Sequence, residues 1–374
     1  MKRPIQKVYL VDGSIAMTGA FVSAREIARA LHDEVDVILV LPQDAAISNR
    51  YLSEFAGVRR IAIKPLRRTI LDAALYIPFL IIAAFQLRYW LWRDRAEVLI
   101  LNDFYLMQGA LVKLLLYRGP VMTWVRIDPS AFGKVASIWL WMAKKSSNQI
   151  VSVSRHIQSC LPKHIRSELL YDPVSVEFLP EPQHKKLREF NFVFIGNYIV
   201  GKGQDVALEA LSKVLPEYPS VRLLFYGGDL GLEKNRAYRL TLEERAVHLG
   251  VTHAVCFGDF IPSPRAVLSG AFASLNLSRS ESFSRTVLEA CACGLPVIAT
   301  RCGGPEEIVL DQHTGFLIPI GDAKKCAEAM IRLCTEPELA ARLGEQGRTR
   351  VMGVFNPQVY AAGLRELIGK ADHV

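Results

Sequence analysis

The chain has 374 residues, of which 51% are hydrophobic and 22% charged, and its formal net charge is +8. At ~100–200 residues per domain the length predicts two or three domains and excludes one small module, and the composition excludes a disordered or fibrous chain. Residues 1–185 hold 24 Lys and Arg against 16 Asp and Glu, whereas residues 186–374 hold 21 of each. This excess is interspersed with apolar runs, which favours an anionic membrane surface or anionic substrate over nucleic acid as partner.

The seven cysteines are odd in number and include no C-x-x-C pair, which is typical of a reduced, cytosolic chain. Near the N-terminus the apolar stretch at residues 8–11 ends at Asp12, so it is too short for a signal-peptide core. We therefore expect a cytoplasmic protein.

The first 160 residues alternate between strand-like and helix-like segments. Residues 7–11 form a β-branched and aromatic run, residues 12–19 a loop, and residues 24–31 show the apolar spacing of a helix. Further buried strands are predicted at residues 35–41, 98–101, 121–125 and 150–153. This alternation predicts a parallel sheet with helices on both faces.

An uncharged run of fifteen residues, 73–87, interrupts this pattern; it contains Pro78 and is shorter than the ~20 residues that span a bilayer. Cations and indoles flank it on both sides: Arg59, Arg60, Lys64, Arg67 and Arg68 before it, and Arg88, Trp90, Trp92, Arg93 and Arg95 after it. These flanks predict peripheral attachment to an anionic membrane surface, with Arg67, Arg68, Arg88, Trp90, Trp92 and Arg93 as contacts. The alternative is a buried core helix with a solvated basic rim.

The alternation breaks between residues 171 and 188, where Pro173, Pro180 and Pro182 precede a polar cluster. We place the domain boundary there, with the first domain at residues 1–183 and the second from 184. In the second domain we predict strands at 190–195, 221–226, 255–257, 273–277 and 296–299 and helices at 204–215, 240–249 and 286–293. The predicted fold class is α/β, with two doubly wound domains whose loops face a common cleft.

A glycine-rich turn lies between the first strand and first helix of the second domain. Residues 196–203 match a phosphate-binding P-loop at seven of eight positions, but Gly203 stands where that loop needs a hydroxyl for Mg²⁺. This argues against nucleotide hydrolysis and favours an anion-binding turn, with Lys202 as a point charge at a helix N-terminus. The alternative is a glycine loop with a solvated lysine.

Two carboxylates, Glu281 and Glu289, are separated by seven residues that include hydroxyl side chains and Arg285. Glu281 precedes a helix and Glu289 lies within it, so backbone N–H groups of the first turn would face an anion near both acids. Thr286 and Glu289 also have the spacing of a capping box, and spacing alone does not separate the two interpretations. Residues 302–307 are predicted to form a tight structural turn before a helix that begins with acids.

Together these segments resemble the C-terminal half of the family 4 glycosyltransferases over residues 190–360. The resemblance rests on the ordered set Lys202-Gly-Gln-Asp205, Glu281 and Glu289, residues 290–300, and Gly303-Gly304 to Thr314-Gly-Phe-Leu317. In the first half, Thr18-Gly19 resembles the family's Gly-Gly loop with its first glycine replaced, and residues 150–154 resemble its strand that ends in Val-Ser.

The resemblance implies the GT-B fold, with an acceptor-binding domain, a nucleotide-sugar-binding domain at 184–356 and a C-terminal helix at 357–374 that packs back on the first domain. It implies that a hexosyltransferase-type enzyme moves a sugar from a nucleotide-diphospho-sugar, with retention of configuration, to a glycan acceptor. The resemblance to bacterial polysaccharide enzymes implies a lipid-linked acceptor on the cytoplasmic face. Neither a cofactor nor a metal is expected, and no Asp-x-Asp occurs.

By position, the resemblance implies that Lys202 neutralises the donor diphosphate, Glu281 faces the donor sugar and Glu289 binds the ribose hydroxyls. The donor-binding set is completed by Gly19, Asn197, Ser282, Phe283, Ser284, Arg285 and Thr286, and the acceptor side by Arg126 and Asp128.

Three differences from the family are visible. Asn197 stands where an arginine is common, and Ser282 and Ser284 replace two glycines of the loop after Glu281. The strand from 121 leads to Arg126-Ile-Asp128, where members often present a histidine. We interpret Arg285 as the replacement for the missing arginine. A nucleotide-sugar epimerase or phosphorylase and a non-catalytic nucleotide-sugar-binding protein stay open as alternatives.

Overall fold

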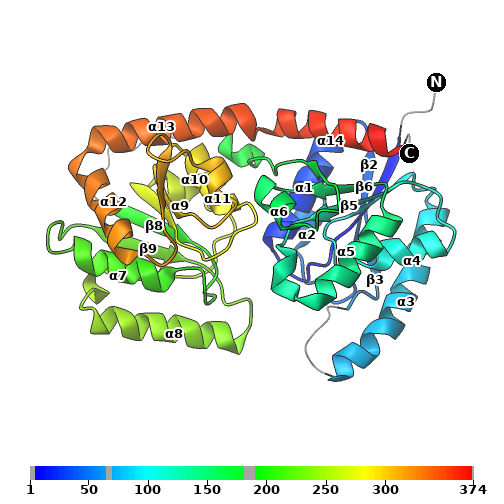
Figure 1. The fold of residues 1–374 in the computed structure, drawn as a ribbon, viewed down its shortest axis with the longest axis horizontal. Helices are drawn as coiled ribbons and strands as arrows, with labels where there is room; N and C mark the ends of the chain where they lie inside the picture. Colours follow the sequence, from blue (N-terminus) through cyan, green and yellow to red (C-terminus); the bar gives the residue numbers. More distant parts are fainter. Residues whose placement is uncertain (1–4, 65–69, 181–189, 373–374) are drawn as a thin grey trace. The chain divides into compact units, whose positions relative to one another are not determined.

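The computed structural model describes residues 5–64, 70–180 and 190–372, which form two compact units (Figure 1). The first unit comprises residues 1–173 with 357–374, and the second comprises residues 174–356. The predicted domain boundary between residues 183 and 184 lies outside the described residues.

The first unit contains a seven-stranded sheet in the order β3-β2-β1-β4-β5-β6-β7, with every neighbouring pair parallel. Its strands are β1 (Lys7–Val11), β2 (Asp36–Pro42), β3 (Gly57–Ile61), β4 (Val98–Leu101), β5 (Val121–Val125), β6 (Gln149–Ser152) and β7 (Glu168–Leu169). Its helices are α1 (Gly19–Leu31), α2 (Asn49–Leu52), α3 (Ile70–Arg93), α4 (Gln108–Leu114), η1 (Pro129–Phe132), α5 (Lys134–Ser146), α6 (Arg155–Cys160) and α14 (Pro357–Asp372). The sheet is parallel, as the alternation of strand-like and helix-like segments predicted.

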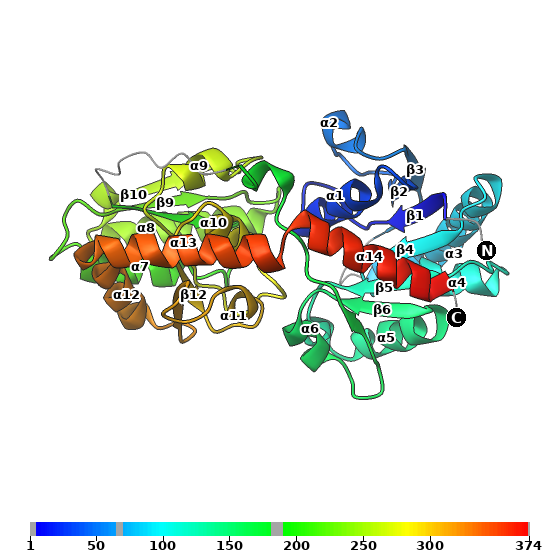
Figure 2. The ribbon, with the colours of Figure 1, turned by 90° about the horizontal axis from the view of Figure 1, so that it is seen from above.

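Side chains of α3 and α4 cover one face of this sheet. Tyr9 and Val11 of β1 pack there with Ala83 and Leu87 of α3 and with Val112 of α4. The C-terminal helix α14 packs along α1, as Figure 2 shows, and Arg365 and Glu34 form an ion pair of 3.0 Å between side chains of this unit.

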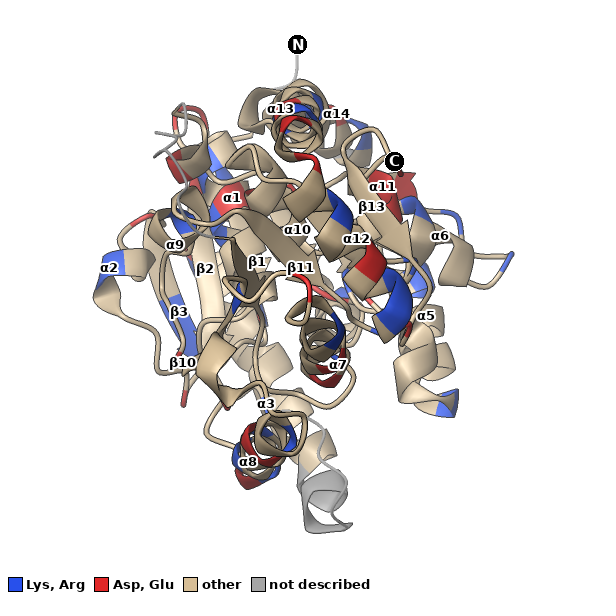
Figure 3. Ribbon diagram, turned by 90° about the vertical axis from the view of Figure 1, so that its left-hand side faces the viewer, with Lys and Arg blue, Asp and Glu red and all other residues tan. Residues whose placement is uncertain are grey.

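The second unit contains a six-stranded parallel sheet in the order β10-β9-β8-β11-β12-β13. Its strands are β8 (Asn191–Ile195), β9 (Arg222–Tyr226), β10 (Val255–Gly258), β11 (Ala273–Asn276), β12 (Val297–Thr300) and β13 (Gly315–Ile318). Its helices are η2 (Val176–Phe178), α7 (Gln204–Val214), α8 (Glu233–His248), η3 (Thr252–Ala254), α9 (Arg265–Ser269), α10 (Arg285–Ala292), α11 (Pro305–Ile308), α12 (Ala323–Thr335) and α13 (Pro337–Val354). Helix α8 contains residues of both charge signs, coloured blue and red on the ribbon in Figure 3, and is longer than predicted.

In both sheets the strand order reverses beside the first strand, between β1 and β4 and between β8 and β11. In open parallel sheets, ligands bind outside the carboxyl ends of the strands at this reversal. The loops after these four strands are therefore where each unit presents its functional groups.

Candidate functional site

The turn after β8 is built from glycines because other residues do not fit there. Gly201 and Gly203 have φ angles of +95° and +91°, which favour glycine. A Cβ on Gly203 would lie 2.1 Å from the carbonyl oxygen of Leu277, which follows β11. The start of α7 therefore lies directly against the end of β11, and this contact brings Lys202 to the reversal point.

Lys202 and Glu281 form an ion pair at this point, with Nζ 2.7 Å from Oε1. The hydroxyl of Ser278 donates a hydrogen bond of 2.7 Å to the same carboxylate oxygen. The backbone of Glu281 is fixed as well, since its N–H donates to Cys302 O and its carbonyl accepts from the N–H of Gly304. The lysine side chain is 33% exposed and the glutamate 15%, so solvent still reaches the charged pair.

The segment between Glu281 and α10 is a tightly shaped loop. Ser284 has a φ of +72°, unusual for a residue other than glycine, and its Oγ accepts a hydrogen bond of 3.1 Å from Asn276 Nδ2. Phe283 is buried against Phe355, whereas Ser282 is partly exposed. Glycine adopts this left-handed conformation without strain, which explains why the family commonly has a glycine at the position of Ser284.

Helix α10 begins at Arg285, with Ser284 as its N-cap residue, so Thr286 lies inside the helix. The capping-box interpretation of Thr286 and Glu289 is therefore wrong. Glu289 is buried in the first turns of α10, and its Oε1 lies 3.7 Å from the guanidinium of Arg285.

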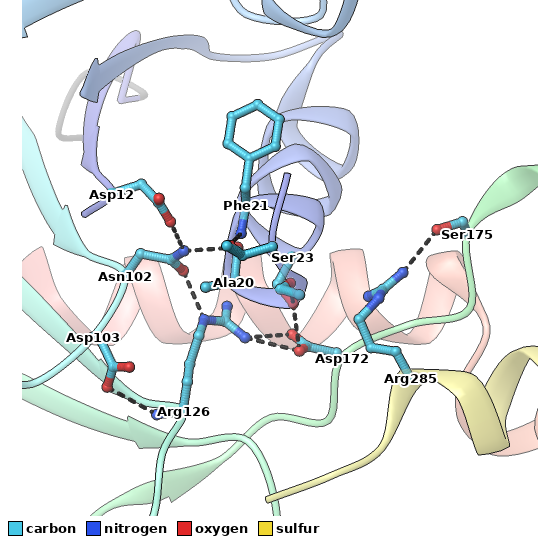
Figure 4. Close-up of polar contacts among 12 residues, drawn as sticks. Asp12, Ala20, Phe21, Ser23, Asn102, Asp103, Arg126, Asp172, Ser175 and Arg285 are labelled. Carbon is cyan, nitrogen blue, oxygen red and sulfur yellow. Dashed lines mark hydrogen bonds and ion pairs between the residues drawn. The ribbon is translucent and has the colours of Figure 1, made fainter. Parts of the chain in front are cut away.

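Arg285 Nη2 donates a hydrogen bond of 2.9 Å to the hydroxyl of Ser175, which Figure 4 shows. Its Nη1 is buried and has no hydrogen-bond partner within the described residues. The predicted phosphate cation is therefore held between Ser175 and Glu289, with one nitrogen left for a further acceptor.

Asn197 connects the ends of two strands. Its Oδ1 accepts a hydrogen bond of 3.0 Å from the N–H of Gly228, and its carbonyl oxygen accepts one from Gln204 Nε2 at 3.0 Å. The sequence predicted Asn197 as a donor-binding residue in the place of a common arginine, but it did not predict this bridge between the loops after β8 and β9.

In the first unit, buried polar groups cluster where β1, β4 and β5 end (Figure 4). Arg126 binds both oxygens of Asp172, at 2.9 and 2.8 Å, and its Nε donates to Asn102 Oδ1 at 2.7 Å. Asn102 Nδ2 donates in turn to Asp12. Arg126 Nη2 is buried and lacks a hydrogen-bond partner among the described residues.

Asp103 is the third acid of this cluster, after Asp12 and Asp172. Its Oδ1 accepts from the N–H groups of Phe104 and Arg126, at 2.9 and 3.2 Å, and its buried Oδ2 has no partner in the described part of the chain. Burial raises the pKa of Asp103 to about 7. Sequence reasoning missed Asn102 and Asp103, although both directly follow a buried strand; Asp172 carries no comparable signal.

The remaining residues predicted in the first unit lie on loops and helix starts. Asp128 accepts a hydrogen bond of 2.8 Å from the N–H of Ser130 and lies near His156 and Cys160, with one ligand-type atom of each within 4.8 Å of the others. Gly19 is the first residue of α1, whose N-cap Thr18 accepts from Phe21 N at 3.2 Å.

Arg67 and Arg68 lie outside the described residues, whereas Arg88, Trp90, Trp92 and Arg93 lie on α3. Trp90 is partly buried, with the guanidinium of Arg59 4.6 Å from its ring centroid and that of Arg93 at 5.2 Å. Trp92 is exposed.

Comparison with known proteins matches the second unit to one family and the whole chain to one fold. Residues 175–350 match the model of the glycosyl transferases group 1. The D-inositol 3-phosphate glycosyltransferase of Acidothermus cellulolyticus is 36% identical over 157 residues, 40% of this chain and 34% of that protein. The GDP-mannose-dependent alpha-(1-6)-phosphatidylinositol monomannoside mannosyltransferase of Mycolicibacterium smegmatis is 31% identical over 185 residues, 47% of each chain. These alignments thus span less than half the length of the two relatives.

Anabaena Alr3699/HepE, solved in complex with UDP-glucose, superposes with a TM-score of 0.83 at 18% identity, covering 97% of this chain and 99% of that one. This likeness shows that the fold is GT-B, as predicted.

Proposed function

Because residues 175–350 belong to the glycosyl transferases group 1 family, we propose that this chain transfers a sugar from a nucleotide-diphospho-sugar to a glycan acceptor with retention of configuration. The observation that carries the proposal is the Lys202–Glu281 pair, held by Ser278 at the strand reversal of the second unit. A charged pair at this place is suited to an anionic ligand that also carries hydroxyl groups.

Lys202 would stabilise the negative charge that develops on the departing diphosphate. Its ammonium has three N–H donors, so it can keep one bond to Glu281 and donate others to phosphate oxygens. Backbone amides of residues 282–286, at the start of α10, would add oriented dipoles that need no protonation step. This division of labour requires no metal ion.

Two acids would bind the donor's hydroxyls. Glu281 lies beside the lysine in the loop before α10 and would face the sugar. Glu289 lies within α10 and would accept hydrogen bonds from the ribose diol. The solved complex of Anabaena Alr3699/HepE with UDP-glucose supports a nucleotide sugar as the ligand of this fold.

The first unit would supply the acceptor side, with Arg126 and Asp128 in the loop after β5. We propose a lipid-linked glycan of bacterial-type polysaccharide or glycoconjugate synthesis, because the mannosyltransferase relative is named for a phosphatidylinositol glycolipid. Such an acceptor places the reaction at the cytoplasmic face of a membrane.

The proposal is tested first by thermal-shift measurements with UDP, GDP, ADP and CMP. A nucleotide at ~100 times its dissociation constant should stabilise the protein by ~2.7 kcal/mol. The donor sugar that matches the stabilising nucleotide is then incubated with a glycolipid acceptor, and the anomeric configuration of the product is read by NMR.

Transfer with retention supports the proposal, and the Lys202→Ala variant should lose most of this transfer activity. Nucleotide binding without transfer or donor hydrolysis would assign the chain to non-catalytic nucleotide-sugar binding, and a rearranged or phosphorolysed sugar would assign it to the epimerase or phosphorylase class.

A further inference from the structure

Helix α3 is apolar on two opposite faces. One face is buried against the sheet of the first unit and is formed by Leu80, Ala83, Ala84, Leu87 and Leu91. The predicted core-helix interpretation therefore describes this face of the helix. A helix that is hydrophobic all round needs a second apolar environment besides the core.

The opposite face of α3 has large apolar side chains in contact with solvent. They recur at helical spacing along the described part of the helix: Ile77, Ile81, Ile82, Phe85, Tyr89 and Trp92. The side chain of Phe85 is 58% exposed and that of Trp92 is 67% exposed. A stripe of this length is more than the scattered single apolar residues of an ordinary surface.

The apolar surface continues onto the neighbouring helices. Helix α4 contacts both α3 and α5, and Arg88 of α3 donates a hydrogen bond of 2.9 Å to the carbonyl of Leu115 at the end of α4. Leu114 and Leu116 are each 78% exposed there. On α5, Val135, Ile138 and Trp141 are exposed. Figures 1 and 2 both show α3, α4 and α5 side by side.

Most of the exposed charges beside this apolar surface are positive. Exposed cations are present on or beside all three helices: Arg93, Arg95, Arg118, Lys134, Lys144 and Lys145. Residues 108–127, which include α4, and α5 contain no Asp or Glu. Asp94, at the end of α3, is held by Arg59 at 2.8 Å and by the hydroxyl of Tyr9, and therefore does not offset the exposed cations.

We propose that the exposed face of α3, with the adjoining ends of α4 and α5, docks the first unit on the surface of an anionic phospholipid bilayer. The apolar side chains enter the headgroup and acyl boundary, Trp92 and Trp141 lie at the interface, and the cations bind lipid phosphates. In this arrangement α3 lies in the plane of the surface. No helix in the described residues has the length and hydropathy needed to cross a membrane.

A second copy of the chain fits this surface less well. A symmetric contact would bring the exposed Arg93, Arg95, Lys144 and Lys145 against the same cations of the other copy, without acids on α4 or α5 to compensate them. An anionic bilayer supplies the apolar interior and the opposite charge together.

The experiment is flotation of the purified full chain with vesicles of phosphatidylcholine, with and without phosphatidylglycerol, at low and high salt. We expect binding to the phosphatidylglycerol vesicles that decreases as salt rises. Arg93→Glu with Arg95→Glu should lower vesicle affinity more than ~10-fold, since each cation near the surface contributes ~1 kcal/mol. The double variant Ile81→Ser with Phe85→Ser, which removes apolar side chains from the exposed face, should abolish flotation.

Matched controls come from the second unit. Leu240 and Val247 are exposed apolar residues on α8, and Lys213 and Lys234 are exposed cations on α7 and α8. Leu240→Ser with Val247→Ser, and Lys213→Glu with Lys234→Glu, should leave flotation unchanged, and circular dichroism verifies that each variant folds.

Three outcomes would overturn the docking: absence of flotation, equal flotation with neutral vesicles, or equal losses in variants and controls. Concentration-dependent dimerisation that Ile81→Ser with Phe85→Ser removes, without flotation, would assign the face to a second copy instead. None of these outcomes depends on sugar transfer, so the failure of this inference and that of the proposed function are distinguishable.

Discussion

The ammonium of Lys202 lies 2.7 Å from Oε1 of Glu281, although 79 positions separate the two residues in the sequence. The contact exists because Gly203 packs on the end of β11 and because the backbone of Glu281 is tied to residues 302 and 304. Each partner therefore orients the other before any substrate arrives.

Lys202→Ala should lower kcat/KM by about 2–4 kcal/mol of transition-state stabilisation, because one cation that neutralises the departing diphosphate is lost. Steady-state kinetics with the cognate donor measures this loss. Lys213→Ala, an exposed lysine on α7, is the control and should retain full activity. An unchanged kcat/KM in Lys202→Ala would contradict the assignment.

Glu281 and Glu289 should differ in role. Glu289→Gln should weaken binding of the free nucleoside diphosphate, because a ribose acceptor is lost, whereas Glu281→Gln should lower turnover and leave nucleotide affinity nearly intact. Calorimetric titration and kinetics separate the two effects. Glu243→Gln removes a comparable i,i+4 pair with Arg239 on α8 and should change neither. A lower melting temperature alone in Glu289→Gln would show that the residue is structural.

Arg285→Ala should raise the donor KM substantially, because its guanidinium, beside Glu289 and with an unpartnered Nη1, is the proposed substitute for the family's arginine. Arg332→Ala, which removes an exposed pair with Glu336, controls for loss of a helical ion pair. If Asn197→Arg improves activity while Arg285→Ala is silent, the compensation is wrong, even though Asn197→Arg also breaks the bond to Gly228.

Arg126→Met should destabilise the protein by about 3–5 kcal/mol, because Asp172 would keep a buried charge without its partner. Arg365→Met removes an exposed pair with Glu34 and should cost less than about 1 kcal/mol. Denaturant unfolding compares the two. Equal, small effects would show that the buried pair is dispensable and leave Arg126 only its predicted acceptor role.

Asp103 should make stability fall as pH rises. Its pKa is about 7 in the folded chain and ~3.9 when unfolded, so between these values the folded state holds a proton that the unfolded state has released. The free energy of unfolding therefore decreases across this window and, for this group, is constant below ~4 and above ~7. Asp103→Asn cannot ionise and should gain about 2–3 kcal/mol relative to the parent between pH 5 and 8.

Urea unfolding at the two pH values measures this gain. Asp33→Asn, at an exposed aspartate, should follow the parent at both pH values. A constant difference between the parent and Asp103→Asn would contradict the raised pKa.

The clearest strand predictions from the sequence are β4 and β5, which are buried at every residue. The predicted β9 and β10 are only partly buried. β4 is apolar throughout and β5 is apolar except for Thr123, and such near-continuous apolar runs are typical of buried parallel strands. β3 was missed because Arg59 and Arg60 break the run and the strand is partly exposed. β7 has two residues, which are too few to show the alternation or apolar run of a strand.

The candidate site, like the strands, was predicted only in part. Lys202, Glu281 and Glu289 were identified by motif order, and the structure brings the first two into contact. The side chains that orient the loop around Glu281 were not predicted, because no motif indicates that Ser278 donates to Glu281 or that Asn276 donates to Ser284. The opposite faces of α3 were also hidden, since a uniformly apolar run has no period that separates core from surface.

The contact of Gly203 with the carbonyl of Leu277 also limits what this loop can become. A serine or threonine at position 203 would complete the P-loop sequence. Its Cβ would lie 2.1 Å from the carbonyl oxygen of Leu277, and its backbone would have to adopt a positive φ. The hydroxyl that a Mg²⁺-dependent nucleotide hydrolase needs therefore requires a shift of the backbone where the start of α7 meets the end of β11. At this position a steric barrier, and not only the identity of one residue, separates this turn from the P-loop sequence.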